Sequence, residues 1–302
     1  MLAARGSEGI GQRLRTAGHD ALINPFGIMY GPTALRQSLE HLVAGSVDED
    51  MHWCPKQELY YSFETHTSLA RPSSEEAREA VDAAARAGHD GLRRASCVFL
   101  TLGSAWVYQH SGRVVANCHR QPQQLFEKRL LGVEEATDEL RRAVRLARTF
   151  DASLPLVLTL SPVRYWREGA VESSRSKAHL LAALHTVVDE TPGVSYFPSY
   201  ELVLDELRDY RWFKQDMLHP SDEAVDFVWR RLQRAHFRPS DDAVRLEVQR
   251  LRAAATHRSA RPNSAAARKF AAAQREAARK LQAKWPHLAL AEEIRHFESM
   301  CS

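Results

Sequence analysis

Between about residue 90 and residue 235, short apolar runs alternate with longer segments of helical periodicity. The runs are nearly continuous in apolar residues, as expected of strands buried on both faces, and they cover residues 97–102, 154–160 and 194–197. Strands that alternate with helices in this way form βα units and a parallel sheet. The alternation therefore predicts an α/β fold.

Local signals place several helices and one hairpin around these strands. Ser73 and Glu76 form a capping box ahead of a helix that runs towards Arg94. Gly112 lies between two β-rich runs and predicts the turn of a hairpin over residues 105–118. Three further helices are expected: over residues 10–17 with Gly18 as the stop, from Pro32 onward, and across Leu140, Val144 and Ala147.

The character of the sequence changes after Arg238. The following stretch is dominated by Ala, Arg, Lys and Gln, which are strong helix formers, and Pro262-Asn263 divides it in two. We therefore expect a domain over residues 1–238 and a basic Ala/Arg-rich helical tail over residues 239–302. A solvated or partner-facing extension, which could hold a protein partner, is favoured over contact with nucleic acid or anionic lipid.

Composition and charge restrict the classes of protein further. The 41 basic and 38 acidic residues give a net charge of +3, which by itself does not argue for nucleic-acid binding. Four cysteines without a CxxC pair fit a reducing compartment, and 14 scattered histidines and 14 scattered glycines form neither a metal motif nor a phosphate-binding loop. No apolar stretch approaches the ~18 residues of a membrane span. We expect a cytoplasmic protein with no membrane span, metal or cofactor.

The segment Asp216-Met-Leu-His219 is the most informative candidate for chemistry. An Asp three residues before a His, in a loop ahead of a helix, can fix the imidazole tautomer while the His takes a proton from a nucleophilic hydroxyl. The alternative is a purely structural helix start, with Ser221 as N-cap and acidic residues behind it. On spacing alone this alternative is favoured.

Other polar residues lie near the expected ends of strands or in early loops. Open α/β sheets place ligand sites at the carboxyl ends of their strands, where Arg164 follows the second run. The amide of Asn117 and the backbone N–H of Gly27 are candidate donors to an oxyanion, although both residues also fit ordinary turns. Cys118 is more often a buried thiol than a reactive one, and Trp106 fits a sugar-binding cleft or a core equally well.

Seven segments, in their order and spacing, resemble blocks of the GSCFA-domain proteins over about residues 6–235. They are residues 24–32, 101–108, 114–119, 160–164, 176–178, 196–211 and 216–220. That family is regarded as a branch of the SGNH/GDSL hydrolase superfamily. The resemblance implies a flavodoxin-like three-layer α/β/α sandwich of the SGNH-hydrolase type, here with a C-terminal helical extension, and Ser-His-Asp ester hydrolysis with no metal.

The resemblance assigns roles to individual residues. It makes His219 the catalytic base, Asp216 its orienting acid, and Asn117 with Gly27 the oxyanion hole. Apart from these carried-over roles, we expect substrate contacts from Arg164, Trp106 and His119, because they lie near the same strand and hairpin ends. In most SGNH proteins the oxyanion Asn directly follows a strand-end glycine, whereas here Gly103 is followed by Ser104.

The largest departure from the family pattern is at the nucleophile. Only Gly6-Ser7 remains of the Gly-Ser-Cys-Phe-Ala motif, which should end a first strand. Either Ser7 is the nucleophile with the rest of the motif deleted, or the motif lies upstream of Met1. A buried strand needs about 5 to 6 residues, so a first strand within Met1–Arg5 is expected to be missing or truncated.

These observations lead to a first hypothesis of an esterase or deacylase that acts on a small acyl ester, such as an acetylated carbohydrate, with Ser7 as nucleophile. An O-acyltransferase would use the same residues. The hypothesis from another class is a non-catalytic carbohydrate-binding or scaffold module with a degenerate nucleophile motif. If Ser7 is not the nucleophile, Ser104 and Cys118 are the next candidates.

Overall fold

The computed structural model describes residues 2–3, 7–238, 241–256, 264–286 and 288–301, with side chains from residue 9 onward. The chain divides into two compact units. Unit 1 comprises Met1–Glu8 and Leu22–Val228, and unit 2 comprises Gly9–Ala21 and Trp229–Ser302. This division differs from the boundary expected after Arg238, because that boundary was set by composition alone.

A parallel sheet lies at the centre of unit 1. Its strand order is β1-β4-β8-β9, and all three neighbouring pairs are parallel. The strands are β1 (Leu2–Ala3), β4 (Val98–Leu102), β8 (Leu156–Leu160) and β9 (Val194–Phe197). Every residue of β8 is buried. The sheet confirms the α/β class, and β1 has only two residues, paired with Leu100 and Thr101.

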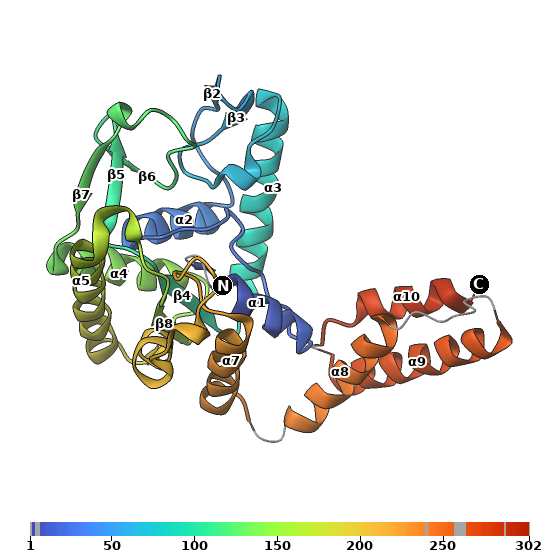
Figure 1. The fold of residues 1–302 in the computed structure, drawn as a ribbon. Coiled ribbons are helices and arrows are strands. Elements are labelled where there is room, and N and C mark those ends of the chain that lie inside the picture. The colour runs from blue at the N-terminus through green and yellow to red at the C-terminus, as the bar shows by residue number, and fades with distance from the viewer. Residues whose placement is uncertain (1, 4–6, 239–240, 257–263, 287, 302) are drawn as a thin grey trace. The chain divides into compact units, whose positions relative to one another are not determined.

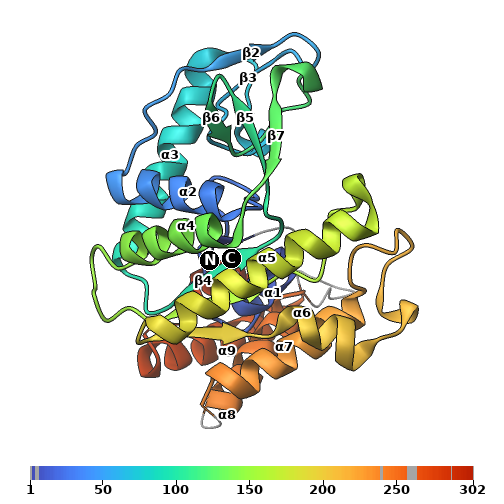
Figure 2. The same ribbon diagram turned by 90° about the vertical axis from the view of Figure 1, so that its left-hand side faces the viewer.

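Four long helices build the main core with one face of this sheet. They are α2 (Pro32–Ala44), α3 (Ser74–Arg93), α4 (Val133–Ala147) and α5 (Gly169–Glu190). The alternate leucines of β4 and β8 pack against them and are fully or almost fully buried: Leu100, Leu102, Leu156, Leu158 and Leu160. Figures 1 and 2 show α2 and α4 lying along each other on the same side of β4. The predicted capping box is present, since the Ser73 hydroxyl accepts from the Glu76 N–H at 3.1 Å.

A second, antiparallel sheet of order β6-β5-β7 lies beyond α2 from β4 (Figure 1). Its strands are β5 (Trp106–His110), β6 (Arg113–Val115) and β7 (Glu127–Leu130). Ser111 and Gly112, both with positive φ, form the turn of the predicted hairpin. A short hairpin, β2 (His52–Cys54) with β3 (Leu59–Tyr61), shares a small core with this sheet.

Apart from α7, the remaining elements of unit 1 are short. A brief helix, α6 (Ser199–Glu201), continues into a π-helical segment over Leu202–Leu207, and α7 covers Asp222–His236. Short 3₁₀ turns occur at Thr67–Leu69, Gln123–Leu125, Trp166–Glu168 and Tyr210–Trp212. Among the described residues, no helix combines the length and the apolar character that crossing a membrane requires.

Unit 2 is helical and has a core of its own. It contains most of α1 (Ser7–Thr16) together with α8 (Asp242–Thr256), α9 (Ala265–Lys284) and α10 (Ala291–Cys301). Six buried residues form this core: Val248, Leu251, Ala278, Leu281, Leu288 and Leu290. The C-terminal part is therefore helical, as predicted, but it is more than a solvated extension. The predicted break at Pro262-Asn263 lies outside the described residues.

Candidate active site

The carboxyl ends of β4, β8 and β9 meet at one edge of the parallel sheet and are followed by hydroxyl residues. Ser104, Ser161 and Ser199 lie there and all are buried. The Ser199 hydroxyl donates to the Leu160 carbonyl at 2.7 Å and contacts the Thr159 hydroxyl at 2.6 Å. The Ser199 hydroxyl thus satisfies a carbonyl at the end of β8, whereas the Ser104 and Ser161 hydroxyls accept from the backbone N–H groups of Trp106 and Val163.

Lys177 bridges two of these strand ends through hydrogen bonds. Its ammonium donates to the carbonyls of Gly103 and Ser161, each at 2.6 Å, and the side chain is buried. Burial lowers the pKa of Lys177 to about 7, because an ammonium loses its hydration in the interior. The sequence pointed to this residue only through its place in one family block, since both carbonyls lie far away along the chain.

Ser104 belongs to the same buried cluster and is not an accessible nucleophile. Its hydroxyl accepts from the Trp106 N–H at 3.1 Å and lies 3.3 Å from the Ser176 hydroxyl. Ser104 is only 3% exposed. Our alternative assignment of Ser104 as nucleophile was therefore wrong, because a substrate cannot reach it in this structure.

Asp216 and His219 form the pair that the sequence predicted. The Nδ1 atom of His219 lies 2.6 Å from Oδ2 of Asp216. The other carboxylate oxygen, Oδ1, accepts from the backbone N–H groups of Leu218 and His219, each at 2.9 Å. These bonds hold the pKa of Asp216 well below its usual range, the backbone N–H of His219 contributing most. The carboxylate is thus anchored and ionised beside the imidazole.

The loop that carries this pair is fixed by the backbone on both sides. The Lys214 N–H donates to the His219 carbonyl and the Ser221 N–H donates to the Trp212 carbonyl, both at 2.7 Å. Ser221 also caps α7, since its hydroxyl accepts from the Ala224 N–H at 3.3 Å. The structural alternative for this segment is therefore correct for Ser221, whereas Asp216 is bonded to His219 and not to the helix end.

Ser7 is the first residue of α1 and follows β1 after a short connection. Many α/β hydrolases present their nucleophilic serine between a strand and the helix that follows it. The Ser7 side chain lies outside the described part of the chain, so its pairing with His219 stays a prediction.

The two predicted oxyanion donors, Asn117 and Gly27, differ in whether their N–H groups already have an acceptor among the described residues. The Asn117 side-chain oxygen accepts from the His119 N–H at 2.8 Å, which fixes the orientation of the amide. The Gly27 N–H instead donates to the Asn24 carbonyl at 2.7 Å, in a turn where Gly27 has a φ of +83°. Gly27 is therefore a turn residue, and its assignment as an oxyanion donor was wrong because its N–H already has an acceptor.

His119 is buried and does not contact substrate, contrary to our prediction. It is 1% exposed, its Nε2 lies 2.8 Å from the Ser62 carbonyl, and its ring stacks on Tyr61 with centroids 4.1 Å apart. Desolvation lowers the pKa of His119 to about 4, so the ring is neutral. Its neighbour Cys118 is half-buried, and burial raises the pKa of that thiol to about 11. Cys118 is thus the unreactive thiol that was favoured.

Arg164 and Trp106 stay candidates for substrate contact. The exposed Arg164 guanidinium lies 5.9 Å from the Trp166 ring, and Trp166 is 48% exposed. The Trp106 ring is half-buried beneath the Lys128 ammonium, which lies 4.4 Å from the ring centroid. These groups offer a guanidinium and aromatic surfaces, which suit a polar ligand with flat apolar faces.

Sequence models of protein families match both the larger N-terminal part and the C-terminal part of the chain. The sequence model of the GSCFA family matches residues 6–232, and the one described as GSCFA domain protein, C-terminal domain, matches residues 248–302. No curated protein and no solved structure matches the chain. The two matches together cover nearly its whole length.

Proposed function

Because this chain belongs to the GSCFA family, we propose that it is a serine esterase or deacylase of the SGNH type. Its substrate would be a small acyl ester, such as an acetyl group on a carbohydrate. The observation that carries the proposal is the contact of 2.6 Å between Asp216 and His219, in a loop where both side chains are partly exposed. A carboxylate bonded to one ring nitrogen leaves the opposite nitrogen, Nε2, to act as a base.

In the proposed reaction, Ser7 attacks the acyl carbon while His219 Nε2 takes the proton from its hydroxyl. Asp216 keeps the other ring proton on Nδ1 and stabilises the imidazolium that forms. His219 then gives the proton to the leaving alcohol. A water molecule attacks the acyl-enzyme in the same way and releases the acid, which restores Ser7.

Two features support this assignment of Ser7 and its surroundings. Ser7 begins α1, and the positive end of a helix stabilises negative charge that develops on the nucleophile and on the oxyanion. Since the Asn117 oxygen is held by the His119 N–H, the amide NH₂ is directed to the opposite side and is the proposed side-chain donor to the oxyanion. In this proposal the parallel sheet is the central layer of a flavodoxin-like sandwich.

The test is hydrolysis of p-nitrophenyl acetate by the full chain and by His219→Ala, Ser7→Ala and Asp216→Asn variants of verified folding. His296→Ala is the matched control, because His296 is an exposed histidine in unit 2. We expect the three site variants to lose activity and the control to keep it. Activity retained in a folded His219→Ala protein would refute the assignment, since the proton would then move through another group.

An acyltransferase would use the same residues and differs only in the group that accepts the acyl chain. Addition of a sugar acceptor to the assay separates the two reactions. Transfer raises the yield of acylated sugar in proportion to the loss of free acid, whereas hydrolysis leaves the yield of free acid unchanged.

A further inference from the structure

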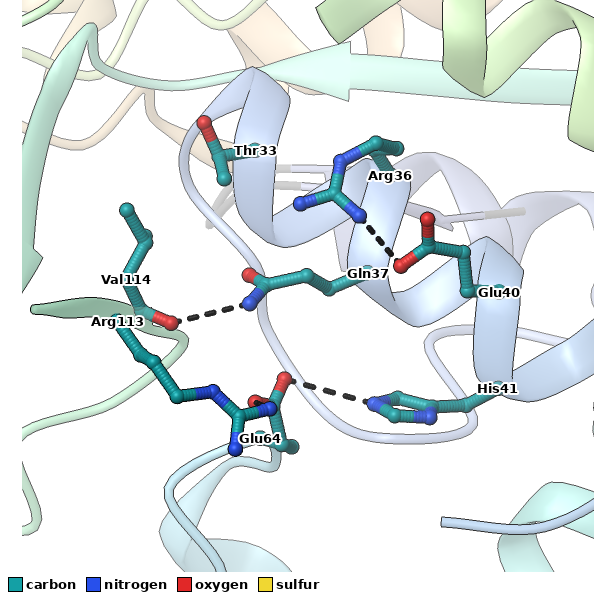
Figure 3. A pocket seen from close by; sticks show the side chains of 8 residues that line it. All are labelled: Thr33, Arg36, Gln37, Glu40, His41, Glu64, Arg113 and Val114. Carbon is teal, nitrogen blue, oxygen red and sulfur yellow. Dashed lines mark hydrogen bonds and ion pairs between the residues drawn. The ribbon is translucent and has the colours of Figure 1, made fainter. Parts of the chain in front are cut away.

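Unit 1 contains a polar pocket of about 290 Å³ that shares no residue with the candidate active site. It lies between α2, the start of β6 and the loop that carries Glu64, as Figure 3 shows. Nearly all of its lining side chains are charged or polar. Polar groups that converge on a concave site can fix the orientation of a small polar molecule.

The Glu64 carboxylate is the most buried charged group of this pocket, with 6% of its side chain exposed. Its nearest cationic or hydrogen-bonding partners are His41 Nε2 at 3.4 Å and the Arg113 guanidinium at 3.7 Å. Charge-assisted hydrogen bonds to a carboxylate normally measure about 2.7–2.9 Å. Glu64 therefore retains the capacity to accept a short bond from a further donor.

Gln37 belongs to the wall of the same pocket. Its NH₂ group donates to the Val114 carbonyl at 3.0 Å, so the orientation of the amide is determined (Figure 3). The opposite atom, Oε1, is buried and has no hydrogen-bond partner among the described residues. A buried acceptor without a donor costs free energy, so this wall of the pocket contains a polar atom that the described residues leave unsatisfied.

The two guanidinium groups that line the pocket are not held equally by their carboxylates. Arg36 pairs with Glu40 and, at 2.7 Å, with Glu139, which lies outside the pocket lining and also pairs with Arg142 at 3.7 Å. Arg113 pairs only loosely with Glu64. A cationic ligand that replaces Arg113 at Glu64 therefore keeps the buried carboxylate paired with a positive charge.

Arg113 already places a cation at the mouth of the pocket. Its side chain is 74% exposed, and it follows the Ser111–Gly112 turn at the start of β6. An exposed arginine 3.7 Å from its partner is held weakly, because solvent screens the attraction and the side chain loses entropy. The guanidinium can therefore leave Glu64 at little cost when a better donor arrives.

We propose that this pocket binds a small molecule through a primary ammonium group, which displaces Arg113 from Glu64. The ammonium has three donors, and one of them makes the short bond to the Glu64 carboxylate that His41 and Arg113 leave unmade. The site is a binding site and requires no ester chemistry, so its test is independent of the proposed enzymatic function.

The experiment is a ¹H–¹⁵N TROSY titration of the full chain, followed at the Gln37 side-chain amide and at the backbone amides of Glu64 and Arg113. The probe is ethanolamine, and ethylene glycol is its uncharged counterpart with a hydroxyl in place of the ammonium. We expect ethanolamine to shift these resonances to saturation and ethylene glycol to leave them unchanged.

Three variants test the geometry. Glu64→Gln keeps the shape of the side chain and is expected to weaken ethanolamine binding at least tenfold. Arg113→Ala removes the competing cation and is expected to tighten it. Glu75→Gln, the same change at an exposed position of α3, leaves binding unaltered.

The proposal is overturned by any of four results. Equal binding of ethylene glycol would show that the pocket does not select for an ammonium group. Absence of any shift in the folded parent would show that the pocket does not bind this amine. Weaker binding in Arg113→Ala would show that Arg113 holds the ligand. Unchanged binding in a folded Glu64→Gln protein would show that the ammonium does not bind at Glu64. If this variant does not fold, the comparison of ethanolamine with ethylene glycol in the parent still tests the proposal.

Discussion

Replacement of Lys177 by methionine removes a buried ammonium while it keeps a side chain of similar length. Two opposing effects follow at any single pH. The carbonyls of Gly103 and Ser161 lose their donor, which costs about 1 to 3 kcal/mol for each buried acceptor, whereas the cost of burying a charge disappears. The net change in stability at one pH is therefore not diagnostic, but its dependence on pH is.

The magnitude follows from the two pKa values of Lys177. Burial lowers its pKa to about 7 in the folded chain, from the ordinary value of 10.5 in the unfolded chain. Between these values the unfolded chain binds one more proton, so stability falls as the pH is lowered from 10.5 towards 7 and then levels off. The limiting slope is about 1.4 kcal/mol per pH unit, which corresponds to a loss of roughly 2 kcal/mol between pH 9 and pH 7.

Urea unfolding at pH 7 and pH 9 measures this difference. The parent is expected to lose roughly 2 kcal/mol more than Lys177→Met over this interval. Lys56→Met, the same substitution at an exposed lysine, is expected to follow the parent. Parallel pH dependences of the parent and Lys177→Met would refute the reasoning, because Lys177 would then titrate at its ordinary pKa.

Three further predictions concern single residues. Asp216→Asn is expected to lower kcat for p-nitrophenyl acetate at least about 100-fold without unfolding the chain, as kinetics and circular dichroism will show. Gly27→Ala places a side chain at a φ of +83° and against His66, so urea titration is expected to show a loss of at least about 2 kcal/mol. His119→Ala is expected to cost roughly 2 to 4 kcal/mol of stability, because a buried stacked ring is lost. The variant is expected to keep the parent's kcat per folded molecule. A specific loss of kcat would show that His119 belongs to the active site.

The parallel strands were predictable because their signals are local. β9 has the limits that the sequence predicted, since its apolar run is bounded by Gly193 and Pro198. β7 carries the sequence Glu-Lys-Arg-Leu and has no such signal. It forms because its backbone pairs with β5, a contact that composition does not reveal.

In the candidate site, too, contacts between residues close in sequence were predictable and contacts between distant residues were not. Asp216 and His219 are three residues apart, so one loop brings them together. Lys177 and His119 were not assigned their observed roles, because their partners Gly103, Ser161 and Ser62 are distant along the chain. The core of unit 2 was missed for a related reason, since each of its helices contributes only a few large apolar residues.

The central claim is that Ser7 is a nucleophile activated by His219. The most direct measurement is reaction of the full chain with a fluorophosphonate, in which the serine oxygen bonds to phosphorus and fluoride leaves, followed by peptide mass mapping. The account predicts a single adduct on Ser7 that disappears in Ser7→Ala and forms far more slowly in His219→Ala. A folded chain that forms no adduct, or forms it on another residue, would contradict the account.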